Sequence, residues 1–350
     1  MSEWCSALSN DVTNESGLSW AIVGAGGIGL TFATMLAASG QPVVLVCRSW
    51  QSDALIANGS FVTGLFGEHR ARPSILDDVR QLPRDVDVYA VATKAYDTET
   101  VASLLAEVAP QSAIVVSLQN GLGNVEALMR ALPQCYVLGA RIIFGAERIA
   151  PNGARVTVCA DDVVIAPKRM PQWRECAQRL VASCRKAHIP ARTESDIEPW
   201  LWAKVLYNAA LNPLGALLNM TYGELANDPL TRAVMNCIIN EAFAVAAAIG
   251  APMHWESADD YREHFYTQLV PPTSAHRSSM LQDLSAGKRT EIDALNGALM
   301  RIGEEHGIAT PFNAVLTAWV KRCEAGERIN PTRIRRKLAK LLESVSHGSR

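Results

Sequence analysis

Short apolar runs alternate with helical repeats in the first part of the chain, whereas helical repeats alone continue in the second part. Four runs before Ile189 are predominantly apolar, namely Trp20–Val23, Pro42–Cys47, Val86–Thr93 and Ala113–Leu118. Runs without polar alternation are typical of a parallel sheet that is covered on both faces. Strands that alternate with helices therefore predict an α/β domain with a doubly wound sheet.

Two details refine this first domain. A helix is predicted to begin at Gly27 and to stop at Gly40. The segment Ala154–Ala166 contains two short apolar runs on either side of Asp161 and Asp162, and it predicts a hairpin that closes one edge of the sheet.

Strand-like runs disappear after Ser195, and the remaining pattern predicts an all-α C-terminal domain. Ser195–Glu198 and Thr290–Asp293 both have capping-box spacing, and each predicts a helix start. Further boundaries are expected from turn and cap residues, with starts near Thr273 and Thr310 and stops at Gly287 and Gly307.

Composition narrows the class of protein. Hydrophobic residues make up 49% of the 350 residues and charged residues 19%, which is enough to build packed cores and excludes disorder as the main state. The 33 basic and 35 acidic residues leave a formal charge of −2, so no nucleic-acid partner is expected. The longest apolar runs, such as Ala242–Gly250, are shorter than the roughly 20 residues of a membrane span, so no membrane partner is expected either.

The eight cysteines have neither CxxC spacing nor the spacing of a metal site, so we expect no bound metal and interpret most of them as buried thiols in a reducing compartment. Residues 1–18 lack the basic and apolar regions of a signal peptide. We therefore predict a flexible leader and a cytoplasmic location.

A glycine-rich motif follows the first predicted strand directly and opens the next helix. Its residues are Gly24, Ala25, Gly26, Gly27, Ile28 and Gly29, in the pattern GxGxxG. A strand before the motif and a helix after it are the context in which such a loop binds a dinucleotide pyrophosphate. We therefore expect Gly24, Gly26, Gly27, Ile28 and Gly29 to contact the cofactor.

The end of the second strand indicates which dinucleotide binds. An NAD site would carry Asp or Glu there, but this chain has Arg48 and no acid before Asp53. A guanidinium can hold a 2′-phosphate with paired hydrogen bonds, so NADP is predicted rather than NAD. Arg48 could also be an ordinary solvated arginine.

The motif and the change of pattern near Ser195 together predict four parts of the chain. These are a leader over residues 1–18, an NADP-binding Rossmann-type domain over 19–194, a helical substrate and catalytic domain over 195–330, and a basic amphipathic tail over 331–350.

Two more polar groups follow predicted strands, at the edge where open α/β sheets bind ligands. Lys94 follows the run that ends at Thr93, and Asn120 follows the run Ala113–Leu118. Lys94 could reach a ribose or phosphate oxygen, and Asn120 could bind the nicotinamide side or the substrate. A surface lysine and an Asn-Gly turn are the alternative interpretations.

A polar stripe marks the helix after Pro199. Lys204, Asn208 and Asn212 are spaced four residues apart among apolar neighbours, so they share one narrow face. Burying an ammonium and two amides without partners is costly, and a stripe that lines a wet ligand site avoids that cost. A snorkelling lysine beside two satisfied core amides is the alternative. By spacing alone Glu291 is structural, because acids are favoured in a first helical turn.

The chain resembles the ketopantoate reductases (2-dehydropantoate 2-reductases), which use NADPH to reduce a 2-keto acid to a 2-hydroxy acid in pantothenate biosynthesis. The resemblance covers about Ser19 to Gly326. It rests on the motifs GAGGIG at 24–29, TKAY at 93–96, QNG at 119–121, LWAKVLYNAALNP at 201–213, and SSMLQD with TEID between 278 and 293.

The resemblance implies a role for each candidate. Lys204 matches the general acid that protonates the carbonyl oxygen, and Glu291 matches a glutamate that hydrogen-bonds the developing hydroxyl. Arg48 matches the 2′-phosphate contact and Lys94 a lysine on the cofactor side. The positions that orient the substrate are matched by Asn120, Asn208, Asn212 and Ser279. A lysine, with an ordinary pKa near 10.4, can donate a proton at neutral pH without special tuning.

Two departures from the family pattern concern the substrate. Tyr222 stands where members often have asparagine, and His276 stands where some have another substrate-side asparagine. Both leave the identity of the 2-keto acid open. A reductase of a different 2-oxo acid or imine, and a non-catalytic NADP-binding regulator, are the rival interpretations.

The tail carries an apolar stripe beside basic residues. Ile334, Leu338 and Leu341 lie on that stripe, with Arg335 and Lys340 among the charges beside it. We expect a helix that packs on the body of the protein or on a second copy in a homodimer. Attachment to a membrane surface is the less favoured alternative.

Overall fold

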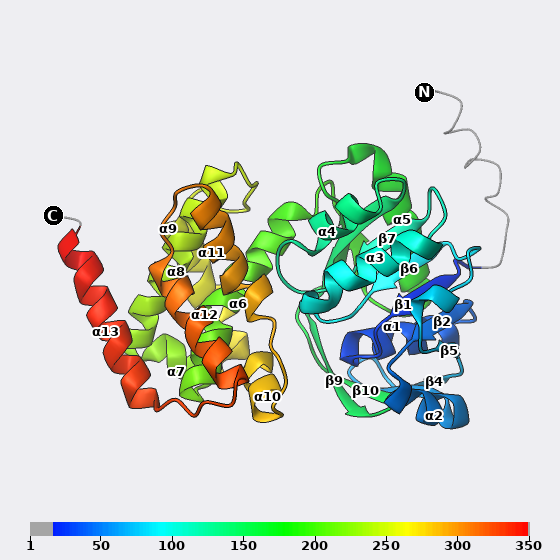
Figure 1. Cartoon of the computed structure of the whole chain (residues 1–350), viewed down its shortest axis with the longest axis horizontal. Coiled ribbons are helices and arrows are strands. Elements are labelled where there is room, and N and C mark those ends of the chain that lie inside the picture. The colour runs from blue at the N-terminus through cyan, green and yellow to red at the C-terminus, as the bar shows by residue number, and fades with distance from the viewer. Residues whose placement is uncertain (1–16, 349–350) are drawn as a thin grey trace. The chain divides into compact units, whose positions relative to one another are not determined.

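A computed structural model describes residues 17–348, and Figure 1 shows the course of the chain. The described chain forms two compact units. The first contains the residues up to Thr93 together with 97–119 and 125–195, and the second contains 94–96, 120–124 and the residues from Asp196 onward. The predicted leader lies outside the described residues except for Gly17 and Leu18.

An eight-stranded sheet organises the first unit. Its strand order is β12-β11-β8-β7-β6-β1-β2-β5, and every neighbouring pair is parallel except β8 and β11. The doubly wound α/β sheet predicted from the sequence is thereby confirmed. The strands are β1 (Trp20–Val23), β2 (Val43–Val46), β5 (Ser74–Leu76), β6 (Val88–Val91), β7 (Ile114–Ser117), β8 (Tyr136–Arg141), β11 (Val163–Pro167) and β12 (Ala191–Thr193).

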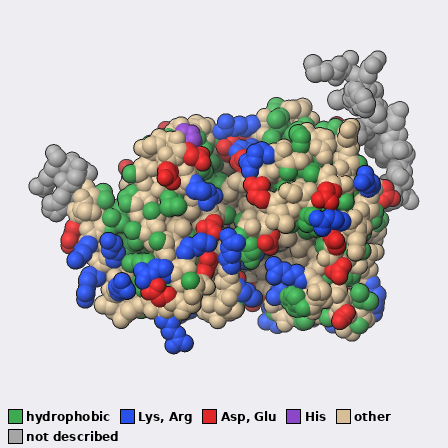
Figure 2. Space-filling view, in the orientation of Figure 1, with side chains coloured by type: hydrophobic (Ala, Val, Ile, Leu, Met, Phe, Trp, Pro, Cys, Tyr) green, Lys and Arg blue, Asp and Glu red, His purple; other side chains and the backbone are tan. Residues whose placement is uncertain are grey.

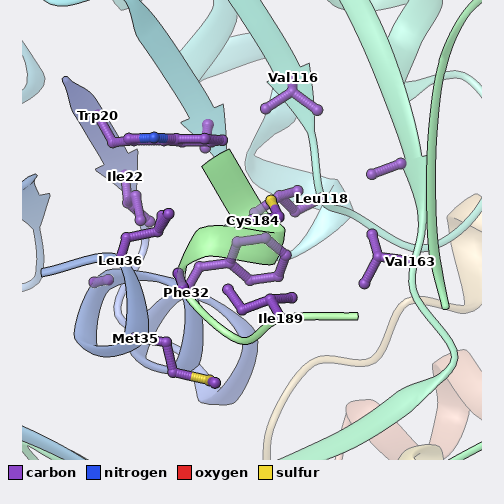
Figure 3. Packing of buried hydrophobic residues seen from close by; sticks show 14 of the residues in the cluster. Trp20, Ile22, Phe32, Met35, Leu36, Val116, Leu118, Val163, Cys184 and Ile189 are labelled. Carbon is purple, nitrogen blue, oxygen red and sulfur yellow. The ribbon is translucent and has the colours of Figure 1, made fainter. Parts of the chain in front are cut away.

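Both faces of this sheet are buried, which explains why its central strands are apolar throughout. Trp20 and Ile22 of β1 pack with Phe32 and Leu36 of the first helix in one core (Figure 3). The indole nitrogen of Trp20 also donates to the hydroxyl of Ser183 at 2.9 Å, so the one polar atom of this large side chain is satisfied.

The helices of the first unit follow the strands in turn. They are α1 (Gly27–Ala38), α2 (Ser49–Asn58), α3 (Thr98–Val108), α4 (Asn124–Ala131) and α5 (Arg174–Lys186), with short 3₁₀ turns η1 (Val79–Gln81), η2 (Ala95–Asp97) and η3 (Pro171–Trp173). Helix α1 begins and ends as predicted, and Gly40 beyond its end has a φ of 83°.

The predicted hairpin over Ala154–Ala166 is wrong, because its two runs belong to different sheets. The first run is β10 (Gly153–Cys159), which pairs antiparallel with β9 (Phe144–Ala150) and parallel with β3 (Ser60–Gly64). With β4 (His69–Ala71) these strands form a second sheet in the order β4-β3-β10-β9. The second run is β11, which is fully buried in the large sheet.

Between the two runs, Asp161 binds arginines of the large sheet instead of making a turn. Its carboxylate accepts hydrogen bonds from Arg141 of β8 at 2.6 Å and from Arg192 of β12 at 2.6 and 3.0 Å. Arg141 is buried, so this carboxylate balances a charge that would otherwise be costly.

Within its described residues, the second unit is helical throughout, as predicted. It contains α6 (Glu198–Leu218), α7 (Tyr222–Asn227), α8 (Pro229–Ala248), α9 (Ala258–His264), α10 (Ser279–Ser285), α11 (Asn296–Glu305), α12 (Pro311–Glu324) and α13 (Pro331–Gly348), with a π turn η4 (Phe265–Leu269) and 3₁₀ turns η5 (Pro271–Thr273) and η6 (Ile292–Ala294). Helix α6 contacts α7, α8, α10, α12 and α13 and so forms the centre of this unit.

Both predicted capping boxes are wrong. At the start of α6 the carboxylate of Asp196, not the hydroxyl of Ser195, accepts the backbone N–H of Glu198. The Thr290 hydroxyl accepts from Ile292, which produces the 3₁₀ turn η6, and α11 begins only at Asn296. The spacing was present in each case, but a hydrogen bond between residues two apart formed instead.

The helix expected near Thr273 also begins later than predicted. The chain forms the turns η4 and η5 first, and α10 starts at Ser279 with the hydroxyl of Ser278 accepting from the backbone of Leu281. The stops at Gly287 and Gly307 and the start at Thr310 agree with the sequence, since both glycines have positive φ and α12 begins at Pro311.

One helix among the described residues, α8, is long and apolar enough to cross a membrane by length and composition alone. Polar residues such as Arg232 and Glu241 interrupt its sequence, so it is not one uninterrupted apolar run. Its Val234, Ile238 and Val245 are buried in the core of the second unit, and it carries Arg232 and Glu241. This combination is also found in core helices of globular proteins.

The C-terminal helix α13 packs on the second unit. Ile334 and Leu338 are buried in the core that α6 and α8 supply, and Arg335 donates to Asp228 at 2.7 Å. Basic side chains gather over α13 in Figure 2. Arg336 and Lys337 of this helix are exposed. Of the two locations expected for the tail, the structure contains the one on the protein body.

Candidate active site

The glycine-rich loop has the backbone that a dinucleotide loop requires. Gly24 has a φ of 113°, which side chains rarely adopt, and a Cβ on Gly29 would collide with the carbonyl oxygen of Gly24. A Cβ on Gly26 would instead meet nothing within 4 Å. Gly26 precedes α1, and neither a side-chain cap nor an acidic residue occupies the first turn of that helix. The loop thus fits a pyrophosphate at a helix N-terminus.

Arg48 is the residue before α2, at the carboxyl end of β2, as the sequence predicts. Its side chain is 73% exposed, and its guanidinium lies 3.6 Å from the carboxylate of Asp97. Strand β2 itself carries no acid. The fold nevertheless brings Asp97 to Arg48 from the loop that follows β6.

A small polar cavity lies in the second unit. Five of its lining residues were predicted from the sequence: Asn120, Asn208, Asn212, Ser279 and Glu291. They come from α6, from α10, from the loop 120–124 and from the segment before η6. Met280, Asp283 and Leu295 complete the lining, and sequence reasoning missed all three. Asp283 had a usable signal, because it is four residues from Ser279 and therefore lies on the same face of α10.

Glu291 holds two chain segments that are distant in sequence. Its carboxylate accepts hydrogen bonds from the backbone of Ala95 and from the side-chain amide of Asn120, both at 3.1 Å. The side chain is only 11% exposed. The plain structural interpretation, an acid in a first helical turn, is therefore incomplete, since this carboxylate forms part of the cavity wall and orients an amide there.

Lys94 is paired with two acids of the same region. Its ammonium lies 2.7 Å from Asp283 and 3.7 Å from Glu291. Burial disfavours the ammonium, but the neighbouring Glu291 and Asp283 carboxylates outweigh that effect and raise the pKa of Lys94. Lys94 is therefore charged at neutral pH, and it offsets the negative charges of these two carboxylates.

Asn212 is fixed by one of the two residues that depart from the family pattern. The buried phenol of Tyr222 donates to the side-chain oxygen of Asn212 at 2.7 Å. Burial raises the pKa of Tyr222, so the phenol keeps its proton. Because the oxygen is engaged, the orientation of the amide is set. The ring of Tyr222 also lies 5.2 Å from that of His276, so the two departures are neighbours.

A buried network supports α6 at the same point. Pro213 has no N–H, so the carbonyl of Ala209 lacks its usual helical partner, and the amide of Asn296 donates to it at 3.0 Å. Asn296 also donates to Asn313, whose own amide donates to Glu241 at 2.7 Å. The position of Asn212 next to Pro213 thus depends on polar groups of three other helices.

Lys204 lies on α6 one turn before Asn208, partly buried, and it is not among the residues that line the cavity. Ser279 is exposed at the start of α10. Among residues 17–348, no group of three or more His, Cys, Asp or Glu side chains is arranged to hold a metal ion.

Comparison with known proteins gives one family for both units. Residues 20–169 match the model described as "Ketopantoate reductase PanE/ApbA", and residues 196–324 match its C-terminal counterpart. A 2-dehydropantoate 2-reductase of Aquifex aeolicus is 37% identical over 303 residues, which are 87% of this chain and 96% of the relative.

Solved structures give the same fold. A PanE/ApbA family ketopantoate reductase from Ralstonia eutropha JMP134 superposes with a TM-score of 0.78 at 31% identity, covering 88% of this chain and 99% of the other. D-mandelate dehydrogenase in complex with NADH and anilino(oxo)acetate has a TM-score of 0.77 at 24% identity, covering 88% and 99% of the two chains. The second likeness concerns the fold alone.

Proposed function

The chain belongs to the ketopantoate reductase family, and from that premise we propose that it reduces ketopantoate to pantoate with NADPH. The family consists of oxidoreductases that use a nicotinamide dinucleotide, and its members carry out this reduction. The observation that carries the proposal is the cavity of the second unit, where Asn120, Asn208, Asn212, Ser279 and Glu291 come together.

The residues for the cofactor lie mainly in the first unit. We assign the pyrophosphate to the loop of Gly24, Gly26, Gly27, Ile28 and Gly29 and the 2′-phosphate to Arg48. The open space at Gly26 and the exposed guanidinium of Arg48 support this assignment. When bound, the reduced nicotinamide supplies a hydride.

The chain's own residues bind and protonate the substrate. We assign Lys204 as the general acid that donates a proton to the carbonyl oxygen, and its charge stabilises the oxyanion as it develops. Glu291 accepts a hydrogen bond from the hydroxyl that forms. We assign the amides of Asn208 and Asn212 to orienting the substrate, Asn120 to both substrate and cofactor, and Lys94 to the cofactor.

A specific observation favours one second candidate, a reductase of a different 2-oxo acid. Tyr222 and His276 are in contact with one another, and Tyr222 binds a cavity amide directly. A bulky phenol in place of an amide alters the shape and hydrogen bonding of that region. The hydride and proton steps are the same in both candidates.

The test is oxidation of NADPH against a panel of 2-keto acids that differ in side-chain size. We expect ketopantoate to have the highest kcat/KM. A clear preference for another 2-keto acid would assign the second candidate, and tight NADPH binding without turnover of any member would contradict both.

A further inference from the structure

An arginine from the second sheet lies beside the start of α2. The guanidinium of Arg148, on β9, stacks over the indole of Trp50 with 4.7 Å between the guanidinium carbon and the ring centre. Trp50 is 53% exposed and follows Arg48 by two residues in the first turn of α2. The stack therefore keeps a second cation next to the residue assigned to the 2′-phosphate.

Contacts with the glycine-rich loop fix the position of β9 and of the start of α2. The buried amide of Gln51 donates to the carbonyl of Ala25 at 3.0 Å and to that of Pro151 at 2.8 Å. One side chain thus ties the loop, the start of α2 and the turn after β9 together. Strand β9 also passes directly against the loop, because a Cβ on Gly27 would collide with the carbonyl of Ala146.

The charges around Arg48 include both a carboxylate and a second guanidinium. Asp97 lies 3.6 Å from Arg48, so the attraction of Arg48 for a phosphate is opposed by a nearby carboxylate. Arg148 and Arg48 are close enough to repel each other, and burial together with that repulsion lowers the pKa of Arg148. A bound phosphate dianion would relieve the repulsion between the two guanidinium groups and outweigh the carboxylate.

We propose that Arg148 is a second binding residue for the 2′-phosphate of NADPH, and that Asp97 limits the strength of that site. This inference rests on the proposed NADPH dependence. It concerns a residue from a different sheet than Arg48, held by its contact with Trp50 and by the hydrogen bonds of Gln51.

The experiment measures dissociation constants of the full-length protein for NADPH, NADH, 2′,5′-ADP and 5′-AMP by calorimetry. Arg148→Ala should weaken NADPH and 2′,5′-ADP by about 10-fold and leave NADH and 5′-AMP within about twofold. Arg70→Ala is the matched control, because Arg70 stacks on Phe61 at 5.5 Å and lies on β4, at the other edge of the same sheet. It should change none of the four constants.

Equal losses for NADPH and NADH in Arg148→Ala, or no loss for either, would overturn the inference. Two further measurements separate it from the proposed function. If Arg48→Ala lowers NADPH preference and Arg148→Ala does not, the inference about Arg148 alone is wrong. If the wild-type protein prefers NADH, the NADPH dependence is wrong and the inference fails with it. Asp97→Asn should strengthen NADPH binding by about twofold to threefold, since it removes a like charge.

Discussion

The glycine-rich loop and the polar cavity, the two sites proposed for cofactor and substrate, are built from the chain in opposite ways. The loop offers a ligand its backbone and open space, and its six residues are consecutive in the chain. The cavity is lined by side chains that come from four separate segments, between Asn120 and Leu295. The first kind of site is specified locally, whereas the second depends on how several helices and loops pack.

The residues that keep each of these two sites in shape differ in the same way. Gly29 lies against the carbonyl of Gly24 within the motif itself, so the loop needs little else to keep its shape. Asn212 depends on Tyr222 for its orientation and on a helix that Asn296 stabilises at Pro213. Changes far from the cavity in sequence should therefore alter substrate binding, while the loop should be sensitive mainly to its own residues.

The largest effect on cofactor affinity is expected for Gly26→Ala. The added Cβ meets no protein atom, so the melting temperature should be unchanged, but the methyl group occupies the space assigned to the pyrophosphate. NADPH affinity should fall by about 100-fold. Calorimetric titration with NADPH and a thermal melt measure the two quantities.

Gly29→Ala is the companion variant, because its Cβ collides with the protein and should lower both stability and affinity. Unchanged NADPH affinity in Gly26→Ala would show that the loop does not bind the pyrophosphate.

A smaller effect is expected for Tyr222→Phe. Loss of the tyrosine hydroxyl leaves the buried side-chain oxygen of Asn212 without its hydrogen-bond donor. The amide is then no longer held in one orientation. KM for the keto acid should rise by about threefold to tenfold, with NADPH affinity unchanged. Steady-state kinetics measure the change.

Tyr207→Phe is a matched control. Tyr207 packs edge-on against Tyr222, but its hydroxyl is bonded to Thr273 at 2.7 Å and not to a cavity amide. A similar KM in both variants and the wild type would remove the positioning role of Tyr222.

The smallest effect is expected for Asp161→Asn, which should alter the stability of the first unit and not the chemistry. Hydrogen bonds from Arg192 and Arg141 hold the pKa of Asp161 well below its ordinary value. The stabilisation is therefore present above the unfolded pKa, near 3.9, and is lost as pH falls further toward the folded value. The carboxylate is 38% exposed, so about 1 kcal/mol is expected at pH 7 after allowance for solvent screening.

Urea unfolding at pH 7 and at pH 3 checks this expectation. The difference between wild type and Asp161→Asn should shrink at the lower pH, and Asp162→Asn is the control on the neighbouring acid. A constant difference would contradict the linkage of this carboxylate to stability.

The doubly wound sheet could be predicted from the sequence because the central strands are mostly apolar and because the glycine-rich loop is a local motif. The sequence could not assign β10 and β11 to different sheets, because both are short apolar runs and strand pairing depends on distant partners. The capping boxes failed for a related reason. The spacing at Ser195 was suitable, but Asp196 competed successfully for the same backbone N–H.

The cavity was predictable only in part. The spacing of Lys204, Asn208 and Asn212 identified one face of α6, but the meeting of Asn120 with Glu291 spans 171 residues and has no local signal. The resemblance to a family, and not the pattern, identified Glu291. The bond from Tyr222 to Asn212 could not be predicted in either way, because it involves a residue that departs from the family.

The most direct test of the proposed reduction, with NADPH on the glycine-rich loop and a proton donor on α6, is the turnover of Lys204→Ala, measured together with its NADPH affinity. Turnover of the keto acid should fall by about 10²–10⁴-fold, because the proton donor is lost. NADPH affinity and the circular dichroism spectrum should be unchanged. A fully active Lys204→Ala enzyme would contradict the account, since no proton donor would then reside on α6.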